Sequence, residues 1–302
     1  PRPRIGIHCA RTPHRAGICC SRGFFLQRRA SAHLRTRPRP PTHRVIVPNS
    51  PAMAQALMSH MFNDWDSTIA YTSPIIYMIY VEIIKRVLPH ENESNKSVIS
   101  VIKVFHNLGL SIASLLMFVG IVHAAWESGK LNSLHNCLCL PFVDEEKAHL
   151  VGRYFYLSKY WEWLDTAFLV IGRKEISWLQ YTHHMSTAIL VHANVYPIIS
   201  GASLLACFTN TLVHVFMYLY FAFPSRFRAY RKWITKMQIL QHFCCLSGFL
   251  YIYTHMDQCY TTALGIQMAL ALYAMYLTFF LLFYIVSYAR DDKSKSKSKK
   301  SI

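Results

Sequence analysis

The chain has 302 residues, of which 53% are hydrophobic and 16% are charged, and apolar runs recur along most of its length. This composition is typical of polytopic membrane proteins and excludes an ordinary soluble domain. The formal net charge of +17 would suit a nucleic-acid-binding protein, but residues 1–52 hold eleven Arg and no acidic residue, and residues 293–302 hold five Lys. Without these two segments the net charge falls to +1, so no nucleic-acid partner is expected.

Residues 1–52 are rich in Arg and Pro and come before Met53. We expect this segment to be upstream translated sequence or an artefact of gene modelling, and not part of the mature protein. The alternative is an organelle transit peptide, which is also rich in Arg and poor in acidic residues. In both cases the predicted functional domain is residues 53–290, followed by a Lys-rich tail over residues 291–302.

Seven apolar segments are long enough to cross a bilayer as helices, which takes about 20 residues each. The expected spans lie near residues 69–88, 98–123, 148–172, 176–194, 198–223, 233–255 and 261–289. We therefore predict an all-α integral membrane protein with seven transmembrane helices. The third span is the most polar, because it contains four charged residues: Arg153, Lys159, Glu162 and Asp165.

Lysine and arginine are concentrated in alternate loops, which predicts the orientation of the chain in the membrane. One set of loops contains Lys85, Arg86, Lys96, Arg173, Lys174, Arg226, Arg228, Arg231, Lys232 and Arg290. The opposite set contains only Lys130 and Lys147, together with several acidic residues. Since basic loops favour the cytosolic side, the C-terminus is predicted to be cytosolic and, with seven spans, the N-terminus lies on the other side.

The tail "KSKSKSKKSI" is a solvated, low-complexity segment that would attract anionic lipid headgroups. Lys299 and Lys300 stand four and three residues from its end, an arrangement that resembles the dilysine signal for retrieval to the endoplasmic reticulum. Such a signal requires a cytosolic tail, which the loop charges predict independently. The expected location is therefore the endoplasmic reticulum membrane.

Polar and ionisable groups recur at helical spacing within four consecutive predicted spans. Such groups are costly in hydrocarbon and by default mark function. The sets that share one helix face are Lys159, Glu162 and Asp165; Gln180, His183 and His184; Asn210, His214, Met217 and Tyr218; and Gln238, Gln241 and His242. One such face alone would be explained by hydrogen bonds that hold helices together. Four in succession predict the lining of a single reaction chamber.

The four faces lie in the segments "KYWEWLDT", "QYTHH", "NTLVHVFMYLY" and "TKMQILQ", in this order. This ordered set resembles the four signature motifs of the ELO family, the fatty acid elongase condensing enzymes of the endoplasmic reticulum. The motifs cover about residues 150–245, and the seven-span pattern extends the resemblance over residues 65–290. The resemblance implies that six of the helices surround a closed substrate tunnel.

The resemblance also implies a reaction. A long-chain acyl-CoA would condense with malonyl-CoA to give a 3-oxoacyl-CoA two carbons longer, with release of carbon dioxide and CoA. No bound cofactor and no metal ion are expected. The chain departs from the commoner histidine box, His-x-x-His-His, because Gln180 takes the first place. Gln180 can form hydrogen bonds but cannot act as a base, and it resembles the variant found in several elongases of polyunsaturated fatty acids.

Each site residue receives a role from this resemblance and from its chemistry. His183 would be the nucleophile that forms an acyl-histidine intermediate, since an imidazole can split one hard acyl transfer into two easier steps. His184 would orient it or move protons, and His214 would be the second catalytic imidazole. Stabilisation of the thioester or enolate oxygen is expected of Asn210, Tyr218, Gln238 and Gln241. Lys159, Glu162 and Asp165 are expected to set the protonation of the histidines and to hold the helices together. Arg173 and Lys174 would belong to a basic rim that binds the phosphates of CoA.

Two other classes of protein fit the sequence less well. A membrane di-iron desaturase or hydroxylase needs about eight histidines in several boxes, whereas the only adjacent pair here is His183 and His184. A seven-span receptor or transporter would leave the four polar faces unexplained. The expected partners of an elongase are the lipid bilayer, the reductases and dehydratase of the elongation cycle, and a second copy of the chain.

Three cysteines fall in loops assigned to the lumenal side, where disulfides can form. Cys259 is expected to pair with either Cys137 or Cys139, and the family resemblance supports such a bridge. Asn92 and Asn95 match the glycosylation acceptor sequence, but their loop is assigned to the cytosol. We therefore predict that neither carries a glycan.

Overall fold

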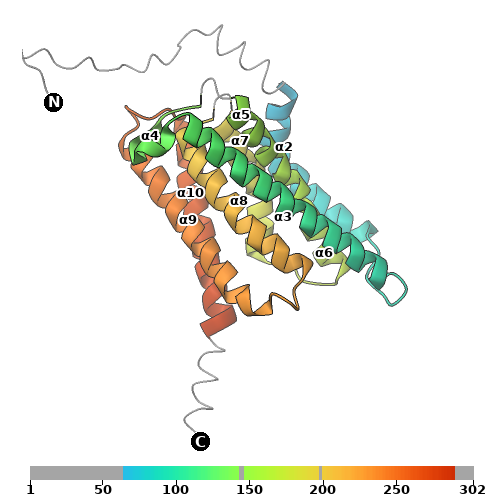
Figure 1. Ribbon diagram of the computed structural model, residues 1–302. Coiled ribbons are helices and arrows are strands. Elements are labelled where there is room, and N and C mark those ends of the chain that lie inside the picture. The colour runs from blue at the N-terminus through green and yellow to red at the C-terminus, as the bar shows by residue number, and fades with distance from the viewer. Residues whose placement is uncertain (1–63, 143–145, 197–198, 290–302) are drawn as a thin grey trace, which may run out of the picture. The chain divides into compact units, whose positions relative to one another are not determined.

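The computed structural model describes residues 64–142, 146–196 and 199–289, and in these ranges it is almost entirely helical (Figure 1). The α-helices are α2 (Asp64–Val87), α3 (Lys96–Glu127), α4 (Leu134–Cys139), α5 (Glu146–Trp161), α6 (Trp163–Ile171), α7 (Trp178–Val195), α8 (Gly201–Ala222), α9 (Arg231–Thr254) and α10 (Ala263–Tyr284). The shorter elements are η1 (Lys130–Asn132), η2 (Arg228–Tyr230) and the π-helical η3 (Ile285–Ala289). The leader over residues 1–52 and the dilysine pair, Lys299 and Lys300, lie outside the described residues.

Every expected span coincides with a helix or, for the third span, with the pair α5 and α6. Four helical segments of the described ranges are long and apolar enough to cross a membrane by length and composition: Ser67–Val87, Lys96–Glu127, Gly201–Ala222 and Ala263–Tyr288. The chain is therefore a helical integral membrane protein. The other three expected spans are less apolar because α5, α6, α7 and α9 contain most of the polar motif residues.

The long helices close into a ring in which each member packs against the next. The order around the ring is α3, α8, α9, α10, α7 and α5, and α5 returns to α3. Figure 1 shows α3, α8 and α9 running alongside one another. Helix α2 stands outside the ring and packs on α7 and α6. Because the polar segments all lie on α5, α6, α7, α8 and α9, the ring allows their polar faces to share one interior.

Helices α5 and α6 are nearly one continuous helix that is interrupted only at Glu162. The backbone N–H of Glu162 donates to the carbonyl of Ser158 at 2.9 Å, as in an α-helix. The N–H of Asp165 then donates to the carbonyl of Glu162 at 3.0 Å, which is the tighter 3₁₀ pattern. One tightened turn does not reverse the helix face, so Glu162 and Asp165 remain on the side that carries Lys159.

A disulfide closes the end of the ring at which α4 meets the α9–α10 connection. It joins Cys139 to Cys259, which is one of the two pairings that the sequence leaves open. The N–H of Tyr260 donates to the carbonyl of Cys139 at 2.9 Å and reinforces the same contact. Cys137 is a free thiol, and burial raises its pKa, which makes the reactive thiolate scarcer.

Candidate active site

A cavity of about 590 Å³ lies inside the ring, and most of the predicted site residues line it. They are Glu162, Asp165, Lys174, Gln180, His183, His184, Asn210, His214, Tyr218, Gln238 and Gln241. Residues from all four motif segments therefore reach one chamber. Lys159 instead lines a void of about 20 Å³ that shares four lining residues with the cavity: His183, Asn210, Gln241 and His242.

A buried ion pair joins the wall of the cavity to the small void beside it. The Lys159 ammonium donates to Glu162 Oε1 at 2.6 Å, and the two side chains are 2% and 1% exposed. Ser158 Oγ also donates to Glu162 Oε1, at 3.3 Å. Two charges this deep are stable only as a pair, because neither could be desolvated alone without a large cost. The pair thus fixes both side chains in the wall.

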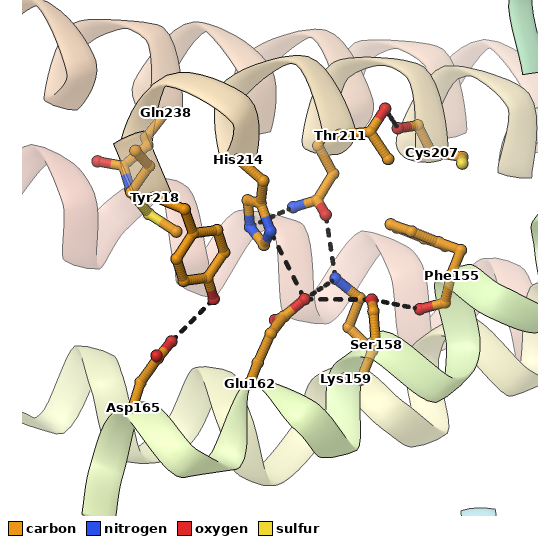
Figure 2. A network of polar contacts seen from close by, with 12 residues as sticks. Phe155, Ser158, Lys159, Glu162, Asp165, Cys207, Thr211, His214, Tyr218 and Gln238 are labelled. Atoms are coloured by element: carbon orange, nitrogen blue, oxygen red, sulfur yellow. Dashed lines mark hydrogen bonds and ion pairs between the residues drawn. The ribbon is translucent and has the colours of Figure 1, made fainter. Parts of the chain in front are cut away.

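This ion pair orients His214 through Asn210. Figure 2 shows His214 beside Glu162 and Lys159. The Lys159 ammonium can only donate, so the oxygen of the Asn210 amide faces it at 3.1 Å. The amide nitrogen of Asn210 must then donate to His214 Nε2, also at 3.1 Å. The proton of the neutral imidazole is consequently on Nδ1, which lies 3.5 Å from Glu162 Oε1. Both nitrogens of His214 are therefore engaged by the wall.

A second carboxyl group lies on the other side of His214. The Tyr218 hydroxyl donates to Asp165 Oδ2 at 2.8 Å (Figure 2). The Tyr218 and His214 rings meet edge to face with centroids 5.3 Å apart. Because the single hydroxyl proton of Tyr218 is used on Asp165, Tyr218 is left as an acceptor toward the cavity.

The two histidines of the box differ in their surroundings. The His183 ring contacts His184 edge to face at 5.4 Å and lies 5.2 Å from the ring of Tyr276. Tyr276 is itself held by Ser186, whose Oγ is 2.6 Å from the Tyr276 hydroxyl. His184 is 4% exposed, and its backbone carbonyl accepts a hydrogen bond from Trp163 Nε1 at 3.1 Å. Packing thus fixes both rings at the cavity.

Gln180 connects the histidine box to the third span and to the outer helix. Its Nε2 donates to Thr166 Oγ1 at 3.4 Å, and Thr166 Oγ1 is 2.8 Å from the hydroxyl of Tyr77 on α2. The amide therefore bridges α7, α6 and α2 while it lines the cavity. This contact requires only a hydrogen bond, so Gln180 can form it although it cannot act as a base.

Basic side chains line the exposed part of the cavity. Lys174 and Arg231 are exposed residues of this lining, so the chamber opens at the end where they lie. Lys103 of α3 also lines it and donates to Glu91 Oε2 at 2.8 Å. This hydrogen bond holds the pKa of Glu91 below its usual value. The opening is therefore suited to anionic groups of a ligand.

Arg173, which was expected on this basic rim, is not among the residues that line the cavity. Its backbone instead closes α6 in a left-handed conformation with φ 52°. Its N–H donates to the carbonyl of Val170 at 3.0 Å, and the N–H of Lys174 donates to that of Leu169 at 2.9 Å. This is the Schellman ending of a helix. The observed role of Arg173 is therefore to end α6 through its backbone conformation.

The described cysteine thiols are not part of the lining of this chamber. None of Cys137, Cys207, Cys244 and Cys245 lines the cavity or the small void. Cys207 and Cys245 are buried in the apolar clusters between the helices. Within the same described ranges, no three His, Cys, Asp or Glu side chains are grouped as ligands for a metal ion.

Reasoning from the sequence missed one polar face, on α3. Lys103 and Asn107 line the cavity, and His106 Nε2 lies 2.8 Å from Asp165 Oδ1. These three residues have the same helical spacing as the faces that were recognised, at offsets of 3 and 4. The signal was therefore present within the expected span 98–123, although no motif contains it.

The sequence matches the ELO family, described as GNS1/SUR4, over residues 60–296. The chain belongs to the ELO family. Its ELO relatives include fatty acid elongase A of Dictyostelium discoideum, 36% identical over 149 residues that make up 48% of this chain and 54% of the relative. Very long chain fatty acid elongase 5 of Macaca fascicularis is 33% identical over 147 residues, 46% of this chain and 49% of the relative.

A third ELO relative, very long chain fatty acid elongase 2 of Rattus norvegicus, is 28% identical over 180 residues, 57% of this chain and 62% of the relative. The chain thus spans about half to three fifths of the length of these three relatives. Membership of the ELO family decides against the di-iron oxygenase and the seven-span receptor or transporter as alternatives.

Proposed function

We propose that this ELO protein is a fatty acid elongase that condenses a long-chain acyl-CoA with malonyl-CoA. The products are a 3-oxoacyl-CoA two carbons longer, carbon dioxide and free CoA. One observation carries the proposal: polar side chains from all four motif segments converge on a single cavity inside a ring of helices. Malonyl-CoA and acyl-CoA are substrates in this scheme, and no further cofactor takes part.

His183 acts as the nucleophile in this mechanism. Among the described residues its ring has aromatic neighbours but no hydrogen-bond partner, so a nitrogen lone pair is available. It attacks the thioester carbonyl, the carbon–sulfur bond breaks, and the imidazole proton leaves with CoA as the thiol. His184 is adjacent, and its buried Nδ1 has no hydrogen-bond partner in the described structure, which leaves it available to receive or return a proton.

The second half of the reaction uses the wall formed by His214, Asn210 and the two Gln residues. Malonyl-CoA loses carbon dioxide, and the resulting enolate carbon attacks the acyl-imidazole, which forms the new carbon–carbon bond and breaks the bond between the acyl carbon and His183. The released imidazole nitrogen then takes up a proton from water by way of His184. His214 is held on both nitrogens, which suits a group that positions the malonyl unit. The amides of Gln238 and Gln241 lie on the neighbouring helix α9 and donate to the enolate or thioester oxygen.

The same geometry supports the finer points of the proposal on topology. The topology proposed from the loop charges has seven spans and a cytosolic opening beside Lys174 and Arg231, where the phosphates of CoA would remain in water. The Cys139–Cys259 disulfide closes the opposite end, on the oxidising lumenal side. The protein then resides in the endoplasmic reticulum with a cytosolic C-terminus, beside the reductases and dehydratase of the elongation cycle. The proposal extends to polyunsaturated acyl-CoA as the substrate, because Gln180 takes the first place of the histidine box, and to pairing with a second copy, as the family resemblance implies.

Expression from Met53 in yeast that is supplied with a panel of fatty acids tests the function. New acids two carbons longer than the supplied ones are expected, and their absence for every acid supplied would refute the activity. The nucleophile is tested separately, by incubating purified protein with an acyl-CoA labelled in the acyl chain. The wild-type protein should retain label that hydroxylamine releases, and His183→Ala should retain none.

A further inference from the structure

His106 is a buried histidine that lies outside all four motif segments. It is on α3, it is 7% exposed, and its two ring nitrogens have different partners. Trp161 Nε1 lies 3.2 Å from His106 Nδ1, and Asp165 Oδ1 lies 2.8 Å from His106 Nε2. Neither His106 nor Trp161 lines the cavity, whereas Asp165 does.

The direction of these hydrogen bonds follows from the chemistry of the indole. An indole N–H can only donate, so Nδ1 of His106 accepts the bond from Trp161. The proton of the neutral ring is therefore on Nε2, and it is donated to Asp165. Since the Tyr218 hydroxyl donates to the other oxygen of Asp165 at 2.8 Å, both carboxylate oxygens are fixed.

We propose that His106 is a positioning residue for condensation, acting on the cavity through Asp165 and Tyr218. Its N–H fixes the rotation of the Asp165 carboxylate, and that carboxylate holds the Tyr218 hydroxyl. The Tyr218 ring in turn lies edge to face against His214, with centroids 5.3 Å apart. The hydrogen bond that His106 makes outside the cavity thereby helps to position the wall that holds the malonyl unit. This inference rests on the proposed elongase function.

Two substitutions separate this role from simple packing. In His106→Gln the side-chain amide nitrogen reaches the place of Nε2, so a donor to Asp165 is kept and the partner of Trp161 is lost. In His106→Asn the amide occupies the place of Nδ1, so a polar group remains near Trp161 but no donor reaches Asp165. A role in packing alone would make the two variants equally impaired, or the Asn variant the better one.

Steady-state condensation by the purified full chain, with acyl-CoA and malonyl-CoA, measures the difference. Loss of a hydrogen bond to a charged group lowers a reaction rate by about tenfold or more. We expect His106→Asn to lower kcat by about that factor, and His106→Gln to remain within about threefold of wild type. Ser111→Ala, which removes a buried hydrogen bond from the same helix to the carbonyl of Val215, is the matched control and should leave kcat unchanged.

A double variant tests the route through Tyr218. If His106 acts by way of Asp165 and Tyr218, then His106→Asn combined with Tyr218→Phe should be no slower than the slower single variant. Multiplied losses in the double variant, or equal kcat values for His106→Gln and His106→Asn, would overturn the proposal. An inactive wild-type protein would instead refute the elongase function, so the two failures are distinguishable.

Discussion

Replacing Glu162 with Gln should destabilise the helical ring strongly, because it leaves the Lys159 ammonium buried without its carboxylate. The two groups lie 2.6 Å apart, and their side chains are 1% and 2% exposed. Removing one partner of such a buried pair costs about 3–5 kcal/mol. For a domain of this size, that loss corresponds to a fall in Tm of roughly 6–20 °C.

Thermal unfolding of the detergent-purified protein, followed by tryptophan fluorescence, measures this loss. The double variant Lys159→Met/Glu162→Gln should recover most of the Tm, since no unpaired charge remains in the wall. Glu127→Gln is the control, because it breaks an exposed ion pair with Lys147 at 2.9 Å and should leave the Tm unchanged. If the double variant unfolds at as low a temperature as Glu162→Gln, the unpaired ammonium is not the cause of the loss.

Three further predictions use other parts of the chain. Cys139→Ser should lower the Tm, because its disulfide spans 120 residues and such a link stabilises by about 4–5 kcal/mol, whereas Cys137→Ser should leave the Tm unchanged. Mass spectrometry after alkylation should show that Cys139 and Cys259 are joined by a disulfide that reductant removes. Arg173→Gly should raise the Tm by a few degrees, because a non-glycine residue at φ 52° costs about 1 kcal/mol. Glycosidase treatment should leave gel mobility unchanged despite the acceptor sequences at Asn92 and Asn95, and a shift would overturn the predicted topology.

The positions of the long helices could be predicted because their signal is local. Each apolar run specifies a helix by its own length and composition, and the expected ends lie close to those of the structure. The interruption at Glu162 and the short helix α4 were not predicted, because each depends on neighbours far away in the sequence. Gly201, for example, begins α8 where a Cβ would overlap the carbonyl oxygen of Leu138 on α4.

The lining of the site could be predicted for a similar reason, since helical spacing alone identifies residues that share a face. Spacing does not show which faces meet. The contact of His106 with Asp165 joins α3 to α6 across 59 residues, and nothing local to either helix indicates it. The choice between Cys137 and Cys139 as the partner of Cys259 could not be predicted for the same reason, because it depends on which side of α4 faces the α9–α10 connection.

The arrangement also separates the histidines by what they can still do. His106 and His214 each have both ring nitrogens engaged, and in each case a group that can only donate, the Trp161 indole or the Lys159 ammonium, determines the tautomer. An imidazole held in this way directs its neighbours but has no free lone pair with which to attack a thioester. Among the described residues the His183 ring has no such partner, although it lies in the same chamber. Under the proposed elongase reaction, these hydrogen bonds favour His183 over His214 as the group that accepts the acyl chain, and His214 would then position the second substrate.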